Sequence, residues 1–228
     1  MRARHLLVVG CFLGAAIAAG GCGKTDAGSP SDPAAINGSQ SAAKPSDGTA
    51  AKPARPKSDP AHPVVVIDTS MGPITVTLDA EKAPLTVTNL LGYIANGHYD
   101  QTIFHQVLKD YVVMGGGYTP QGAEKKARPP IFNEADNGLK NVRGAIAMVR
   151  QPGVINSATC QFYINVTENP NLDFKNRTPE EYGYCVFGKV TAGMEVVDRI
   201  AAVAVQDRGE FERIPVEPVI IKSIQQTQ

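Results

Sequence analysis

The stretch that most constrains the fold is residues 102–118, where two short apolar segments flank a polar dipeptide and three glycines follow. Residues 102–108 and 111–114 are rich in β-branched and aromatic side chains, and Lys109-Asp110 separates them, a pattern that predicts a β-hairpin. The run Gly115 to Gly117 indicates a backbone that takes unusual dihedral angles or lets another group approach closely. Taken alone, the stretch fits either an ordinary sheet corner with a flexible exit or the edge of a binding site.

Further segments favour the binding site, because they match one known family in order along the chain. With the hairpin, they are Phe104-His105-Gln106-Val107, Met114-Gly115-Gly116-Gly117, Gln161-Phe162-Tyr163-Ile164 and Val186-Phe187-Gly188-Lys189-Val190. They resemble the cyclophilins, the β-barrel peptidyl-prolyl isomerases. The intervening residues 133–139 and 143–148 resemble the bacterial branch of that family. The resemblance extends from about residue 63 to the C-terminus, and several independent segments in order are far more specific than one motif.

The rest of this region has the pattern of a mostly β protein. Alternating or β-branched segments predict strands at 64–68, 74–78, 144–150, 161–166, 184–190 and 219–224. Helical spacing of apolar residues predicts one helix over 84–96, through Val87, Leu90, Leu91 and Ile94, and another over 193–202. Together with the resemblance, this pattern predicts a closed antiparallel β-barrel, cyclophilin-like and capped by two helices, over residues 63–228.

The resemblance also implies a site and a reaction. An Xaa-Pro bond rotates slowly, over a barrier of about 20 kcal/mol, because rotation breaks amide resonance. Catalysis needs no nucleophile, but it needs a pocket for the proline ring and a donor that favours the twisted amide. In the family an arginine is this donor; its position here is Gln106, and Gln161 is retained as a second catalytic residue. The implied substrate-binding residues are Tyr111, Val112, Met114, Val149, Arg150, Tyr163, Asn171, Leu172 and Tyr184.

Several of these positions depart from the family pattern. Gln106 is neutral and shorter than arginine, and Met114 replaces a glutamine that orients the arginine. Tyr111 and Tyr163 stand where the family usually has phenylalanine, so two hydroxyl groups need partners. Two functions therefore stay open: a prolyl isomerase slowed by Gln106, and a non-catalytic proline-peptide-binding chaperone or assembly module. A purely structural barrel fits less well, because the groove residues are too polar and specific for packing alone.

The N-terminal residues predict export. Residues 1–21 have the pattern of a signal peptide, in which Arg2 and Arg4 precede an apolar run shorter than the about 20 residues of a transmembrane helix. Ala19-Gly20-Gly21-Cys22 resembles a bacterial lipoprotein cleavage box, which predicts acylation of Cys22; the alternative is a plain signal peptide with Cys22 incidental. Residues 22–62 are rich in Ala, Pro, Ser and Gly and predict a disordered linker. We therefore expect a membrane-tethered lipoprotein in the periplasm or cell envelope.

Composition and residue spacing limit the kinds of ligand and partner that this chain is expected to bind. The 22 basic and 22 acidic residues leave no basic excess that would indicate nucleic-acid binding. No cofactor or metal is predicted, because His98 and His105 lack ligand spacing. Cys160 and Cys185 are predicted to be unpaired and packed, since a hairpin of 161–166 with 184–190 would hold them too far apart to bridge. We expect a monomer whose partners are proline-containing unfolded or partly folded polypeptides.

Overall fold

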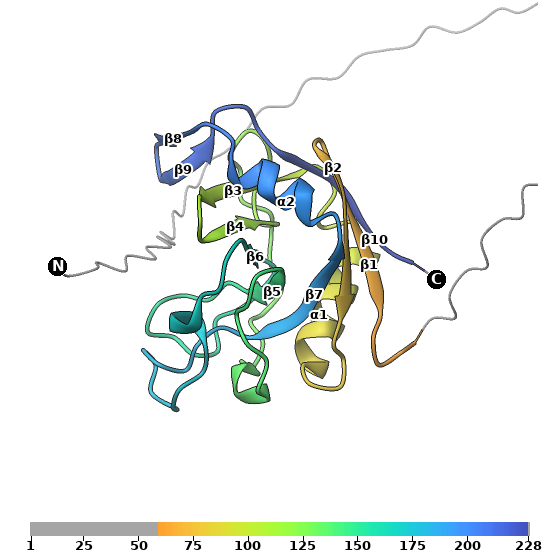
Figure 1. The fold of residues 1–228 in the computed structure, drawn as a ribbon, viewed down its shortest axis with the longest axis vertical. Helices are drawn as coiled ribbons and strands as arrows, with labels where there is room; N and C mark the ends of the chain where they lie inside the picture. The colour runs from red at the N-terminus through yellow and green to blue at the C-terminus, as the bar shows by residue number, and fades with distance from the viewer. Residues whose placement is uncertain (1–58, 228) are drawn as a thin grey trace, which may run out of the picture. The chain divides into compact units, whose positions relative to one another are not determined.

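Eight strands close an antiparallel barrel in the computed structural model, which describes residues 59–227 (Figure 1). The strand order is β1-β10-β3-β4-β6-β5-β7-β2, and pairing of β1 with β2 completes the ring. The strands are β1 (Val64–Thr69), β2 (Gly72–Leu78), β3 (Thr102–Leu108), β4 (Val112–Gly115), β5 (Ala145–Met148), β6 (Phe162–Asn165), β7 (Val186–Ala192) and β10 (Ile220–Gln226). The predicted mostly β barrel is confirmed.

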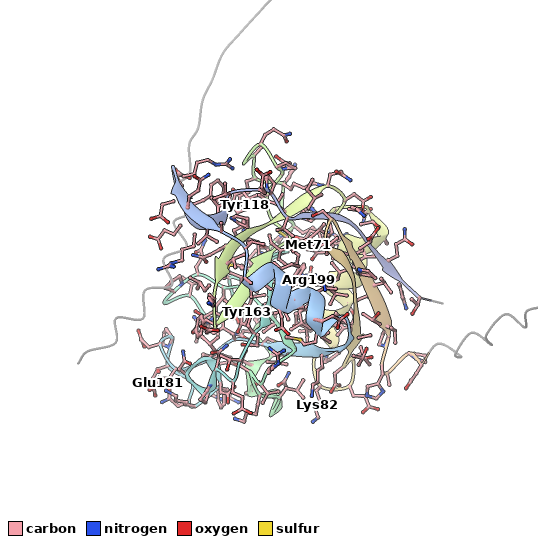
Figure 2. All side chains as sticks on the ribbon, turned by 45° about the horizontal axis from the view of Figure 1, so that its top comes forward. Met71, Lys82, Tyr118, Tyr163, Glu181 and Arg199 are labelled. Carbon is pink, nitrogen blue, oxygen red and sulfur yellow. The ribbon has the colours of Figure 1, made fainter. Side chains whose placement is uncertain are left out.

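Two α-helices accompany the barrel, as predicted. α1 (Pro84–Ala95) begins at a proline, whose fixed φ suits the first helical turn. Asn96 caps its C-terminus, and Gly97 follows with a φ of 61°. Its buried residues are Thr86, Val87, Leu90 and Tyr93, so the buried stripe is rotated from the predicted one. α2 (Met194–Ala201) packs against β2, β3 and β4, and the Arg199 guanidinium donates to the Met71 carbonyl at 2.8 Å (Figure 2).

A second, two-stranded sheet was not predicted. β8 (Val205–Arg208) and β9 (Phe211–Pro215) form a hairpin that packs against β3. The Phe211 ring contacts Tyr118 edge-on at 4.9 Å between centroids, and Tyr118 contacts His105 at 4.8 Å. The hairpin is mostly charged and exposed, so it lacks the apolar alternation by which a strand is recognised.

Alternation along the strands divides the apolar side chains into two clusters. The inner cluster fills the barrel and includes Ile74, Val76, Phe104, Val113, Ile146, Phe162 and Phe187. The outer cluster consists of Val112, Met114, Ala145, Ala147, Val149, Tyr163, Leu172 and Val186. Phe162 lies in the inner cluster and Tyr163 in the outer one, which confirms that neighbours on this strand take opposite faces. The outer cluster gives β4, β6 and β5 an apolar outer face.

The two cysteines of the barrel are free and buried, as predicted, but the structural reason differs. β6 and β7 do not pair with each other, because β5 lies between them. The predicted hairpin of 161–166 with 184–190 is therefore wrong. Burial raises the pKa of the Cys160 thiol to about 11 and that of Cys185 to about 12, so both thiols stay protonated and poorly nucleophilic near neutral pH.

The described residues begin just before the predicted domain boundary at 63. Asp59 accepts a hydrogen bond from the Ala61 backbone N–H at 3.0 Å, and the Ala80 N–H donates to the Ala61 carbonyl at 2.8 Å, so these residues join the barrel. The predicted signal peptide, Cys22 and most of the predicted linker lie outside the described residues. Within residues 59–227, no helix is long and apolar enough to cross a membrane.

Candidate active site

A β-bulge in β3 turns Gln106 to the outer face of the barrel. Phe104 pairs with Gly115 and Gln106 pairs with Met114, so His105 is an extra residue without a partner position on β4. Phe104 therefore lies in the inner cluster, whereas Gln106 lies beside Met114 of the outer cluster. The Gln106 side chain is half-buried and makes no hydrogen bond to any residue in the described range. Its amide is free to bind a ligand.

Gln106 begins a row of cross-strand neighbours on this outer face. Met114 pairs with Tyr163 on β6, Tyr163 pairs with Ala147 on β5, and Ala147 pairs with Val186 on β7. All four side chains belong to the outer cluster, which also contains Val112, Val149 and Leu172. The row forms an apolar floor with a polar amide at one end. Such a floor suits an apolar ring flanked by polar backbone groups.

Gln161 borders the same face, two residues before Tyr163 on the chain. Its side chain is 9% exposed, and its buried Oε1 atom has no hydrogen-bond partner. The side chain lies over Gly117, where a Cβ atom would come within 2.6 Å of Gln161 Cγ, and Gly116 has a φ of 89°. The glycine at position 117 therefore lets the Gln161 side chain approach the backbone closely. A buried unpaired acceptor costs about 1–3 kcal/mol, which a ligand N–H would offset.

Both unexpected tyrosine hydroxyl groups have partners in the protein. The Tyr163 hydroxyl donates to Asn141 Oδ1 at 2.8 Å, and Asn171 Nδ2 donates to the Tyr111 hydroxyl at 2.9 Å. Burial raises the pKa of both phenols, that of Tyr163 well above its ordinary value, so both stay neutral. The tyrosines therefore present their rings to the groove without an unpaired polar group.

Arg150 supports the border of the groove from within the protein. Its guanidinium is buried and donates from Nε to the Gly183 carbonyl at 2.9 Å and from Nη2 to the Pro179 carbonyl at 2.8 Å. It also lies 4.9 Å from the centroid of the Tyr184 ring, whose edge contacts Tyr163. Figure 2 shows Tyr163 on the side of the barrel toward the segment that carries Glu181. Arg150 thus holds residues 173–184 and the Tyr184 ring in position.

Comparison with known proteins gives a family match that covers the whole barrel. Residues 64–226 match the profile of the cyclophilin type peptidyl-prolyl cis-trans isomerase family. The chain belongs to the cyclophilins. Peptidyl-prolyl cis-trans isomerase cyp18 of Streptomyces antibioticus is 46% identical over 159 residues, which cover 70% of this chain and 95% of that protein. Peptidyl-prolyl cis-trans isomerase B of Escherichia coli is 44% identical over 161 residues, which cover 71% of this chain and 98% of that protein.

Solved structures show the same likeness. A Cryptosporidium parvum cyclophilin type isomerase, crystallised in the presence of the dipeptide Ala-Pro, superposes with a TM-score of 0.59 at 25% identity. The match covers 72% of this chain and 99% of that one. The protein described here is therefore a peptidyl-prolyl cis-trans isomerase of the cyclophilin type, and its closed barrel with two helices is the fold of its structural neighbours.

The structure of this cyclophilin brings most of the predicted site residues to one face. Val112, Met114, Val149, Tyr163 and Leu172 form the floor, and Tyr111 and Tyr184 pack against it. Gln106 and Gln161 border it, whereas Arg150 and Asn171 reach it through Tyr184 and Tyr111. Sequence reasoning missed Leu108, Ala147, Val186 and Asn141. Ala147 could have been found, because it lies two residues from Val149 on one strand segment.

Proposed function

We propose that this cyclophilin isomerises Xaa-Pro bonds of exported polypeptides on the outer face of β3, β4, β6 and β5, with Gln106 as a neutral donor. The observation that carries the proposal is the unpaired, buried Gln161 Oε1 beside the apolar row that Gln106 begins. An acceptor of this kind calls for an N–H from a ligand. The presence of Ala-Pro with the Cryptosporidium parvum protein supports a proline peptide as that ligand.

The proposed mechanism uses binding and electrostatics only. The proline ring lies against Met114, Tyr163 and Leu172, and a flanking backbone N–H donates to Gln161 Oε1. As the amide twists, resonance is lost and the lone pair localises on the proline nitrogen. Gln106 Nε2 donates to that nitrogen, and this hydrogen bond is strongest in the twisted state. No bond is made or broken, and no proton is transferred.

The neutral donor predicts slow turnover. A neutral hydrogen bond contributes about 1 kcal/mol, whereas one that involves a charged group contributes about 1.5–3 kcal/mol. The difference, on the order of 1–2 kcal/mol, corresponds to roughly ten-fold or more in rate. Gln106 is thus also the residue that favours the second candidate, a proline-peptide-binding chaperone with little turnover.

A protease-coupled isomerase assay with a proline tetrapeptide tests the proposal. Gln161→Leu should lower kcat/KM at least ten-fold without lowering the melting temperature, because leucine fills the space and removes a buried unpaired acceptor. The matched control is Gln225→Leu, an exposed position on β10, which should change neither. Unchanged kcat/KM in Gln161→Leu would contradict the proposed groove. Saturable peptide binding by the wild type without turnover would favour the chaperone.

We propose further that Cys22 is acylated and tethers the protein in the periplasm or cell envelope, joined to the barrel by residues 23–62. The support is in the sequence, where three small residues precede Cys22 and a segment rich in Ala, Pro and Ser follows it. A tether there would leave the groove open to proline-containing polypeptides as they emerge after export.

A further inference from the structure

A cavity of about 370 Å³ opens on the outer face of β2, β7 and β5, next to the end of the groove floor at Val186. Thr77, Lys189 and Ala145 are cross-strand neighbours in this part of the sheet, and all three line the cavity. Gln106 and Gln161 do not line it. The volume lies in the lower part of the range, about 300–1,000 Å³, that small-molecule sites occupy.

The body of the cavity is apolar. Leu139, Val142, Ala145 and Val186 supply its walls. Ala145 and Val186 are buried members of the outer cluster, whereas Val142 is 39% exposed. Binding of an apolar ligand group in this cavity would remove exposed apolar surface from water, which is favourable.

The charged residues of the lining are mostly basic. His62, Lys140 and Lys189 line the cavity, and Asp79 is the acidic residue among them. His62 pairs with Asp59 at 3.0 Å, and Lys140 pairs with Asp173 at 3.6 Å. Lys189 is exposed and has no ion pair with any residue between 59 and 227. Its ammonium group is therefore available to an anion at the mouth of an apolar cavity.

We propose that this cavity binds a small amphipathic anion, an acyl chain that carries one carboxylate. The acyl chain contacts Leu139, Val142 and Val186, and the carboxylate faces Lys189. The complementarity has two parts, an apolar hollow of ligand size and an unpaired cation at its opening. The groove and the cavity share Val186 but use different polar residues, since Gln106 and Gln161 border the groove and Lys189 lines the cavity.

Isothermal titration of the protein with decanoate, below the concentration at which decanoate aggregates, tests the proposal. The expected result is one saturable site that Lys189→Glu weakens at least ten-fold. Thr191→Trp, an exposed lining position, should abolish binding by filling the opening. The matched control Lys126→Glu reverses an exposed charge outside the lining and should leave the affinity unchanged. Isomerase activity should be retained in all three variants, which reports that the barrel is folded.

Four results would overturn the proposal. These are no saturable binding of decanoate, equal affinity in Lys189→Glu, equal affinity for decanol, and displacement of decanoate by an Ala-Pro peptide. Equal affinity for decanol would show that the charge has no role, and displacement by Ala-Pro would place decanoate in the groove. Because Lys189 is a surface residue, its reversal keeps the test valid even if Thr191→Trp fails to fold.

Discussion

Gln106 faces the outside of the barrel because β3 contains one extra residue, His105. The bulge at His105 lets Phe104 fill the barrel while Gln106, two positions later, lies on the outer face beside Met114. The His105 ring contacts Phe211 of the β8–β9 hairpin and Tyr118, which follows β4. The same residue thus orients the donor and packs a neighbouring element.

His105 should make stability depend on pH. Burial lowers the pKa of this imidazole from 6.5 to about 4, and its Nδ1 atom has no partner. Between these two values the unfolded chain binds a proton that the folded protein does not, so stability is full above pH 6.5 and falls on acidification toward pH 4. The loss should be on the order of 1.4 kcal/mol per pH unit, and up to roughly 3 kcal/mol in all.

Urea unfolding of the wild type and of His105→Phe, measured from pH 7.5 to 4, checks this prediction. Phenylalanine keeps a ring for the contacts with Tyr118 and Phe211 and cannot titrate. Its stability should depend less steeply on pH than that of the wild type over this interval. Parallel pH profiles would mean that the imidazole is not buried in its neutral form.

Several elements are joined beneath the groove by buried amides. Asn141 Oδ1 accepts from the Tyr163 hydroxyl and from Asn165 Nδ2, and Asn169 Nδ2 donates to Asn165 Oδ1 at 2.7 Å. Asn169 precedes the 3₁₀ helix η2 (Pro170–Leu172), which carries Leu172 of the floor. Asn141 therefore connects β6 with the segment that completes the pocket, and such satisfied buried networks are rigid.

A double-mutant cycle between Asn141 and Tyr163 tests this connection. Asn141→Leu leaves the buried Tyr163 hydroxyl without an acceptor, which should cost about 1–3 kcal/mol of stability and raise KM for a proline peptide. Adding Tyr163→Phe removes the unpaired hydroxyl, so it should restore part of the stability and of KM. The control is Tyr163→Phe alone, which should cost about 1 kcal/mol. Purely additive effects of the two substitutions on unfolding free energy would contradict the network.

The individual elements were more predictable than their arrangement. The β3–β4 hairpin and both helices follow from local pattern, as do Pro84 at the start of α1 and Gly97 after its end. Alternation alone would have placed Gln106 on the same face as Phe104, because no sequence signal marks the bulge. The neighbours of β6 were mispredicted because barrel closure, rather than chain order, decides which strands pair. Asn141 was missed because a loop asparagine carries no signal of a distant hydroxyl partner.

At the scale of the whole molecule, the two surfaces of the barrel have different roles. The inner surface forms the hydrophobic core, and the outer surface forms the floor of the groove. The inner cluster fills the interior of this eight-stranded barrel, so a ligand must bind outside it. The outer cluster indicates where a ligand binds, because β4, β6 and β5 bury apolar side chains on both faces. The chemistry is then decided by the few polar groups at the border of that face, Gln106 and Gln161.

Attachment to the membrane is a prediction about the whole chain. If Cys22 is acylated, Cys22→Ser should shift the protein from the membrane fraction to the soluble fraction or block its processing. Fractionation followed by mass spectrometry of the mature protein measures both. A membrane-bound Cys22→Ser variant with the mature mass of the wild type would contradict lipidation.

The central claim, that Gln106 occupies the donor position of a prolyl isomerase groove, is tested most directly by kcat/KM in a double-mutant cycle with Met114. Gln106→Arg alone should gain little, because Met114 cannot orient a guanidinium by hydrogen bonding. Gln106→Arg with Met114→Gln should raise kcat/KM by more than the product of the single changes, and about ten-fold above the wild type, with peptide affinity changing much less. A folded double variant that is no faster than the wild type would show that Gln106 does not face the proline nitrogen.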